Sequence, residues 1–164
     1  MRRSDREITD VGEVLKIIEK CDVCRLALSA DNIPYIVPMN YGFEYTGGNL
    51  VLYFHSAHEG RKLDIIRENP FACFEMDTSH RIIEADEACG FSMEYESVMG
   101  SGKISFCSEK SGKIKALNQL MKNYAKDRVF SFSDHELESV TVFRLDVAEF
   151  TAKRCMKPGA PAPR

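Results

Sequence analysis

The chain has no tryptophan, no long apolar run and no excess of positive charge. None of its apolar runs approaches the roughly 18 residues that a membrane-spanning helix needs, so no membrane partner is expected. The formal net charge is −3 at pH 7, and no basic stripe interleaves with aromatic residues, so no nucleic-acid partner is expected. The acid-rich start does not read as a signal peptide, and we therefore expect a cytoplasmic location.

Two common nucleotide-binding motifs are also missing. The Rossmann fingerprint G-x-G-x-x-G does not occur. Residues 99–103 look like part of a phosphate loop, but Ser97 stands where the first glycine is needed and Ile104 replaces the required Ser or Thr. The sequence thus excludes a Walker-type nucleotide site.

Cysteine is present, with six residues, but no metal-ligand pattern accompanies it. Cys21 and Cys24 form a C-x-x-C pair, which is compatible with a redox or zinc role. No second C-x-x-C or histidine pair follows at zinc-finger spacing. We predict free, buried thiols and no metal site, with redox or zinc chemistry as the alternative.

Apolar periodicity predicts six strands and three helices. The strands are expected at residues 23–29, 33–45, 50–55, 71–76, 93–107 and 140–150, and the helices at 10–20, 59–68 and 108–124. Because most strands follow one another through turns, the pattern favours a mainly β fold, a closed antiparallel sheet with helices packed outside. We expect one domain over residues 1–153 and a flexible or partner-contacting tail over 154–164.

Residues 77–90 are acidic and irregular in composition. Structureless loops of that length usually have a use, so a lid or a dimer contact is possible for this segment. A plain surface loop is the alternative, and the sequence favours it.

The most informative stretch is residues 52–62, Leu-Tyr-Phe-His-Ser-Ala-His-Glu-Gly-Arg-Lys. It leads from a strand into a helix whose first turn carries Arg61 and Lys62, which is unfavourable for the helix dipole unless an anion binds there. Ser56 is a further donor for a phosphate, and His55 adds one at the strand end. Alternatively, the two cations are solvated helix residues and His55 bonds to backbone.

The preceding strand contains two prolines, Pro34 and Pro38, and proline cannot donate to a β-ladder. This indicates an edge or a bulge. Amides around residues 37–40 would then be free to meet the pyrimidine edge of a flavin ring, while the strand supplies an apolar wall. An edge strand simply protected by its prolines is the alternative.

These motifs resemble the FMN-binding split-barrel family, in its pyridoxamine 5′-phosphate oxidase-related branch and, within that, the nitroimidazole-reductase (nitroimidazole resistance, Nim-type) proteins. The resemblance is carried by residues 34–42, 52–62, 69–70 and 95–102. It implies a six-stranded antiparallel split β-barrel and a homodimer with FMN at the subunit interface. The flavin ring would lie along Val37, Pro38, Met39 and Asn40, with His55 and Ser56 beside it, Arg61 and Lys62 at its phosphate, and Ser97 on a facing strand.

The sequence departs from true pyridoxamine-phosphate oxidases in two places. Those enzymes have a basic residue where Asn40 stands, and they carry a C-terminal Trp/Arg substrate motif that this chain lacks. We therefore expect an FMN-dependent oxidoreductase that reduces a small nitroimidazole-like or quinone-like acceptor, possible electron donors including NAD(P)H. His55 is the candidate catalytic residue, as a proton donor on the substrate side.

Two other functions fit the same residues. A non-catalytic flavin carrier or sensor would explain the missing substrate motif. A haem-binding split barrel would use His55 or His58 as an axial ligand.

Overall fold

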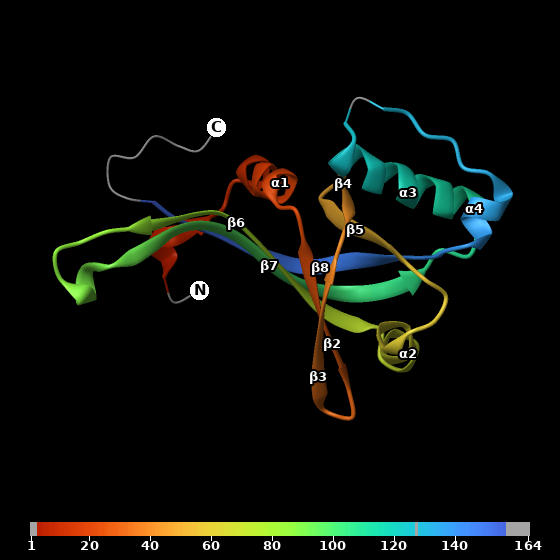
Figure 1. Ribbon diagram of the computed structural model, residues 1–164, viewed down its shortest axis with the longest axis horizontal. Helices are drawn as coiled ribbons and strands as arrows, with labels where there is room; N and C mark the ends of the chain where they lie inside the picture. The colour runs from red at the N-terminus through yellow and green to blue at the C-terminus, as the bar shows by residue number, and fades with distance from the viewer. Residues whose placement is uncertain (1–2, 127, 157–164) are drawn as a thin grey trace.

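A computed structural model describes residues 3–126 and 128–156 of the chain. The strands are β1 (Glu7–Ile8), β2 (Cys24–Ala30), β3 (Ile33–Met39), β4 (Gly42–Thr46), β5 (Asn49–Ser56), β6 (Phe71–Ile83), β7 (Ser92–Phe106) and β8 (Thr141–Cys155). The helices are α1 (Val11–Lys20), α2 (Arg61–Glu68), α3 (Lys110–Tyr124) and α4 (Asp134–Glu138), with 3-10 turns η1 (Ser4–Arg6) and η2 (Ala88–Gly90). Figure 1 shows how they are arranged.

All eight strands belong to one antiparallel sheet, ordered β3-β2-β6-β7-β8-β5-β4, with β1 paired to β8. β3 and β4 are its two edges, yet only Asn40 and Tyr41 separate them in the chain. Three Cα steps span at most about 11 Å, so the two edges meet at this corner. The sheet is therefore curled into a split barrel, as the sequence predicts.

The predicted number of six strands is wrong, because the sheet has eight. The single strand expected over residues 33–45 is divided at Asn40 and Tyr41 into β3 and β4, and β1 is an addition near the N-terminus. Tyr41 is fully buried, and its hydroxyl donates to the carbonyl oxygens of Ile18 and Cys21. This tertiary anchor bends the chain where a local pattern predicts a continuous strand.

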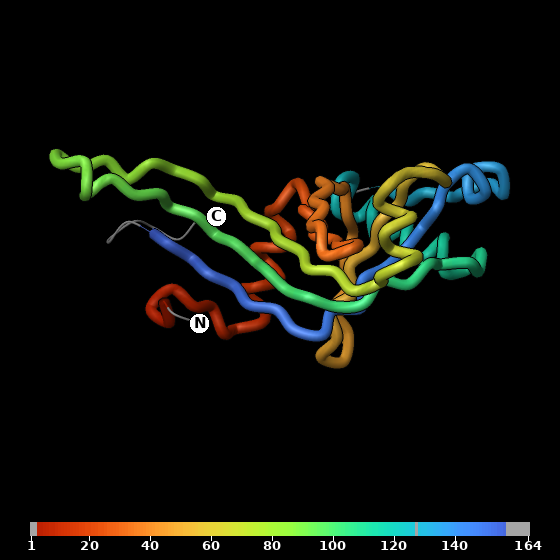
Figure 2. The backbone as a smooth tube through the Cα atoms, turned by 90° about the horizontal axis from the view of Figure 1, so that it is seen from below, coloured from red at the N-terminus to blue at the C-terminus, as the bar shows by residue number. Residues whose placement is uncertain are grey.

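The irregular excursion expected over residues 77–90 is largely wrong as well. β6 continues to Ile83 and stays paired with β7, with a register shift near Ser79, whose φ is +61°. Together the ends of β6 and β7 form a two-stranded arm that projects from the rest of the sheet (Figures 1 and 2). Cross-strand pairing, including Arg81 Nε to Glu94 Oε2 at 2.6 Å, orders a segment whose composition looks loop-like.

Two apolar clusters hold the helices in place. α1 begins at the predicted cap, where the Asp10 carboxylate accepts from the Glu13 N–H, and it buries Val14, Ile17 and Ile18 in the main core. α3 and α4 cover the outward side of β5 and the start of β8, around Tyr53 and Val142. No helix among the described residues is long and apolar enough to cross a membrane.

β8 reaches Cys155, so residues 154 and 155 of the expected tail are part of a strand. Residues 157–164, the remainder of that tail, lie outside the described residues.

Candidate functional site

The turn between β5 and α2 forms the expected strand-to-helix junction. β5 ends at Ser56, and α2 starts at Arg61 after the N-cap Gly60. Gly60 has φ +135° and ψ 153°, a conformation that side-chain-bearing residues rarely adopt. No side chain caps the helix, and a Cβ at position 60 would meet nothing within 4 Å. The Leu63 and Asp64 N–H groups donate to the Gly60 carbonyl, and the position of a Gly60 Cβ faces open space.

Two cations surround this helix start. The guanidinium of Arg61 lies over the ring of Tyr35 in β3, 5.0 Å from its centroid. This cation–π contact brings the beginning of α2 to the edge strand. Lys62 is half-buried, and neither Arg61 nor Lys62 forms an ion pair within the described part of the chain. We call Gly60, Arg61, Lys62 and Tyr35 the anion cradle.

His55 and Ser56 lie on opposite sides of β5, because successive side chains of a strand alternate. Ser56 is buried on the core side, and its hydroxyl donates to the Ala57 carbonyl at 2.8 Å. His55 is exposed on the side that α3 and α4 cover. Partial desolvation, and secondly the charge of Lys62, lower the pKa of the His55 imidazole below its usual 6.5. His55 is therefore mostly neutral at pH 7.

His58 fastens the turn to the segment between α4 and β8. Its Nε2 lies 2.6 Å from the Glu138 carbonyl oxygen, and its Nδ1 lies 3.1 Å from the Thr141 hydroxyl. A carbonyl only accepts, so Nε2 donates to it, and the Thr141 hydroxyl, which can donate or accept, pairs with Nδ1. With both ring nitrogens engaged, His58 is a structural residue and a poor candidate for an axial haem ligand.

β3 divides its predicted site residues between two faces. Val37 and Met39 pack against the main core, whereas Pro38 is exposed with Ile36 on the other side. Asn40 is exposed in the link to β4. β3 pairs with β2 without a break, and proline cannot donate to a ladder, so Pro34 and Pro38 must have their nitrogens on the edge that is not paired with β2. Backbone groups of alternate residues point to the same edge. The unpaired edge therefore carries the N–H of Ile36 and the carbonyls of Pro34, Ile36 and Pro38.

Ser97 is not brought to the anion cradle of its own chain. Lys103 of β7 pairs with Phe71, which lies near the end of α2. Ser97 is six residues before Lys103, so it lies about 20 Å along β7 from that point. Ser97 lines a hollow of about 180 Å³ together with Met99, Thr151 and Lys153. It faces outward with Met99.

An open face extends over the outward sides of β3, β2, β6 and β7. Ile36, Ala27, Cys73 and Ser101 form one row of neighbours across these four strands. Exposed apolar side chains lie along the face: Ile36 is 65% exposed, Phe71 65% and Met99 54%. Such a surface is typical of one that a partner covers.

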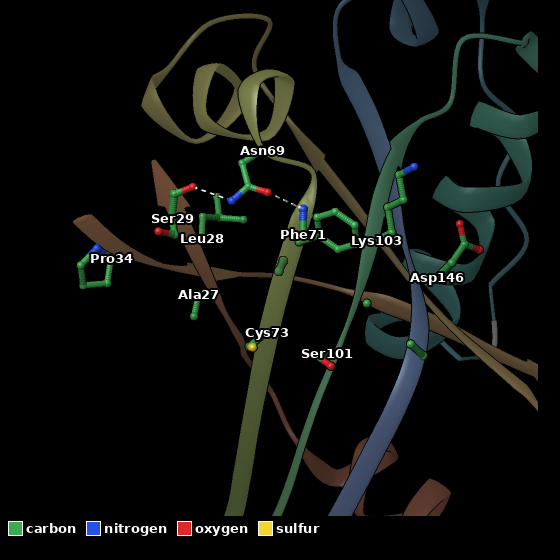
Figure 3. A pocket seen from close by; sticks show the side chains of 13 residues that line it. Ala27, Leu28, Ser29, Pro34, Asn69, Phe71, Cys73, Ser101, Lys103 and Asp146 are labelled. Atoms are coloured by element: carbon green, nitrogen blue, oxygen red, sulfur yellow. Dashed lines mark hydrogen bonds between the residues drawn. The ribbon is translucent and has the colours of Figure 1, made fainter. Parts of the chain in front are cut away.

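A groove of about 660 Å³ crosses the open face next to the end of α2 (Figure 3). Asn69 shapes one end, since its Nδ2 donates to the Ser29 carbonyl at 3.0 Å and its Oδ1 accepts from the Phe71 N–H at 3.2 Å. The walls are mainly small or apolar, with Lys103 and Asp146 as the charged residues.

The C-x-x-C pair is buried and carries free thiols. Burial raises the pKa of Cys21 to about 12, and burial also raises that of Cys24. Thiols held in the protonated form neither attack disulfides nor bind zinc readily. No cluster of potential metal ligands occurs among the described residues.

Sequence reasoning missed Tyr35 as a member of the cradle. The contact joins residues far apart in the chain, and its only local signal is an aromatic residue in an edge strand. It also missed α4, although Ser133 and Glu136 have the spacing of a capping box, which the structure contains.

Comparison with known proteins places these features in a family. The family model for pyridoxamine 5′-phosphate oxidase matches residues 10–154. A structure from Bacteroides thetaiotaomicron, assigned to 5-nitroimidazole antibiotic resistance, is 33% identical over 90% of this chain and 86% of its own, with a TM-score of 0.78. A search of curated proteins gives no match.

Two more distant structures share the fold. The flavocytochrome Anf3 from Azotobacter vinelandii is 20% identical, covers 96% of this chain and 73% of its own, and has a TM-score of 0.78. The FAD- and heme-binding protein from Mycobacterium smegmatis is 18% identical, with coverages of 97% and 77% and a TM-score of 0.79.

Proposed function

The chain belongs to the pyridoxamine 5′-phosphate oxidase family, and from this premise we propose that it binds FMN and reduces a small aromatic acceptor. The acceptor is nitroimidazole-like or quinone-like, in line with the resemblance to the nitroimidazole resistance structure. The observation that carries the proposal is the anion cradle.

The cradle suits a phosphate dianion. The uncapped start of α2 supplies N–H donors and the positive end of the helix dipole. Arg61 and Lys62 add two charges without ion-pair partners among the described residues, and the open space before Gly60 leaves room for the anion. Bound phosphate would also relieve the repulsion between these cations and the helix end.

The flavin ring is proposed to lie along β3. The unpaired edge of this strand would offer the pyrimidine ring the Ile36 N–H and the carbonyls of alternate residues, and Pro38 and Asn40 are the exposed residues at its end. Val37 and Met39, which face the core, hold the strand in place from behind. Ser56, buried at the end of β5, stiffens the turn through its bond to Ala57.

Bound FMN supplies the hydride and electron chemistry, and the protein supplies binding, orientation and protons. His55 is proposed to stand at the substrate side. Its lowered pKa leaves it mainly neutral near pH 7, where it offers one N–H and one lone pair. The neutral imidazole is a much weaker acid than the imidazolium. His55 would therefore donate a proton more readily as the pH falls and the imidazolium becomes more populated.

A homodimer is proposed to bury the open face. The apolar residues Ile36, Phe71 and Met99 provide the surface, and a symmetric partner would present the same set. Ser97 lies on this face and would reach the flavin of the second copy rather than its own. Sedimentation equilibrium at micromolar concentration should give twice the mass of the chain, and a monomer would contradict this part.

The absorbance spectrum of the purified protein tests the proposal. Flavin bands, bleached by NAD(P)H and restored by a nitroaromatic acceptor with turnover, are expected. Flavin bands without turnover would indicate a carrier or sensor. A Soret band would indicate haem, for which His55 is the remaining candidate ligand because His58 is fully engaged.

A further inference from the structure

A second cavity, of about 270 Å³, lies beneath α3 and α4. Its walls are mainly apolar, and they include Leu117, Leu120, Met121 and Phe132. The titratable residues that line it are His55 and Glu136. Sites for drug-sized ligands usually measure about 300–1,000 Å³, so this cavity suits a molecule of one or two rings.

His55 connects this cavity to the anion cradle. Its imidazole lines the cavity, and it is close enough to Lys62 for that charge to depress its pKa. The two His58 bonds, at 2.6 and 3.1 Å, fix the cradle turn to the ends of the segment 138–141. Ser139 and Val140, in the middle of that segment, line the cavity. The cradle and the cavity are thus neighbouring parts of one region.

The cavity is held by rigid supports. Leu117 and Leu120 belong to the buried cluster between α3 and the sheet. The Lys113 ammonium donates to the carbonyl oxygens of Leu137 and Val140 at 2.7 and 3.2 Å, which joins α3 to the end of α4. A preformed apolar cavity of this kind costs little to organise when a ligand binds.

Glu136, an exposed residue, is the ionised residue in the lining of the cavity. Both hydrogen bonds that Glu136 accepts, from the N–H and the hydroxyl of Ser133, go to Oε2 at 2.7 Å. Oε1 has no such bond from the described residues. These bonds from Ser133 lower the pKa of Glu136, so the carboxylate is ionised at neutral pH. No lysine or arginine is among the described lining residues.

We propose that this cavity is the acceptor pocket, that it takes an uncharged aromatic ring next to His55, and that Glu136 excludes anionic rings. The inference rests on the proposed function and adds to it a location and a substrate class. A phosphorylated or carboxylated ring would place its charge beside the Glu136 carboxylate, and it would lose hydration on entering the mainly apolar cavity. Neutral nitroaromatic rings meet neither cost.

Two probes of nearly equal size test the pocket. 4-Nitrobenzyl alcohol is neutral, and 4-nitrobenzoate is an anion at pH 7. Their dissociation constants are measured by ligand-observed NMR on the full chain with FMN added. The neutral probe should bind at least about tenfold more tightly than the anion.

Three variants locate the binding. Met121→Trp fills the cavity from α3 and should weaken binding of the neutral probe at least about tenfold. Met93→Trp makes the same change on the β6–β7 arm, where the side chain is 43% exposed, and should leave binding unchanged. Glu136→Gln keeps the capping box, because glutamine also accepts from Ser133, and should reduce the preference for the neutral probe at least about fivefold.

Equal binding of the two probes by the wild-type protein, or unchanged binding in a folded Met121→Trp protein, would overturn the inference. Glu136→Gln provides an independent test if Met121→Trp does not fold, since an unchanged probe preference also overturns it. The binding assay needs no turnover. If the protein does not bind the added FMN but still binds the neutral probe more tightly than the anion, the proposed function is refuted and the inference about the pocket is supported.

Discussion

Replacing Arg154 by methionine is expected to destabilise the fold by about 1.5–3 kcal/mol, because it removes the charge-assisted hydrogen bond to one oxygen of a buried carboxylate. The Glu96 side chain is 0% exposed, and its Oε1 accepts from Arg154 Nε at 2.6 Å. Its Oε2 accepts from Lys20 Nζ at 3.1 Å and from the Ser79 hydroxyl at 2.9 Å. Arg154 also bonds to Glu13 in α1 at 3.1 Å. The network joins α1 to β6, β7 and β8 at the base of the arm.

Urea denaturation of the wild-type and Arg154→Met proteins measures this loss. The matched control is Arg144→Met on the same strand, where the Arg144–Asp146 pair is 46% and 45% exposed, and a cost of about 0–1 kcal/mol is expected. For a chain of this length, the loss at Arg154 corresponds to a fall in Tm of roughly 3–12 °C. Equal costs at the two arginines would refute the reasoning.

The same network predicts acid sensitivity. Burial raises the pKa of Glu96, but the hydrogen bonds from Arg154, Ser79 and Lys20 outweigh it, and the net shift is below the usual 4.5. A carboxyl with a depressed pKa in the folded state contributes stability above its unfolded pKa, and loses it as the pH falls through the folded value. The stability difference between wild type and Arg154→Met should therefore be largest above pH 4.5 and shrink below it.

Two further perturbations test the local accounts. In Lys62→Met, the pKa of His55 followed by NMR should rise but stay below 6.5, because desolvation is the larger cause; an unchanged value would remove Lys62 from the neighbourhood of the imidazole. Gly42→Ala should destabilise the protein by at least about 1–3 kcal/mol in thermal unfolding, since its Cβ would lie 2.3–2.5 Å from backbone atoms of Gln119 and Leu120. Gly112→Ala in α3, whose Cβ has only one neighbour at 3.8 Å, should instead stabilise by up to about 1 kcal/mol, and equal losses at both glycines would contradict the close approach.

Much of the fold could be predicted because local chemistry and tertiary structure agree. The Asp10 cap sets the start of α1, and Asp31 and Asn32, with φ of +51° and +60°, form the hairpin turn that their sequence indicates. The end of α2 at Asn69-Pro70 also follows local rules.

Other features depend on contacts that no local pattern contains. The break between β3 and β4 is fixed by the hydroxyl of Tyr41 on two carbonyls of the α1 region. The polar end of β6 is a strand because β7 pairs with it, through contacts such as Arg81 to Glu94. The mostly polar composition of that segment predicts a loop when the pairing with β7 is not known.

The candidate site shows the same division. The sequence pattern predicted the cations at the start of α2, and the structure places them there. Alternation along β5 already implies that His55 and Ser56 face opposite ways, so that separation was available from the sequence. The distance between Ser97 and the cradle could not be predicted from the sequence, because it depends on the register of β7 against β6.

The most direct test of FMN binding at the anion cradle compares FMN with riboflavin, which lacks the phosphate. Affinities for both ligands are measured by flavin fluorescence in the wild-type protein and in Arg61→Ala/Lys62→Ala. The double variant should lose about 10–100-fold in FMN affinity and little in riboflavin affinity, because only the phosphate contacts are removed. If both affinities fall together, or neither changes, the cradle does not bind the phosphate.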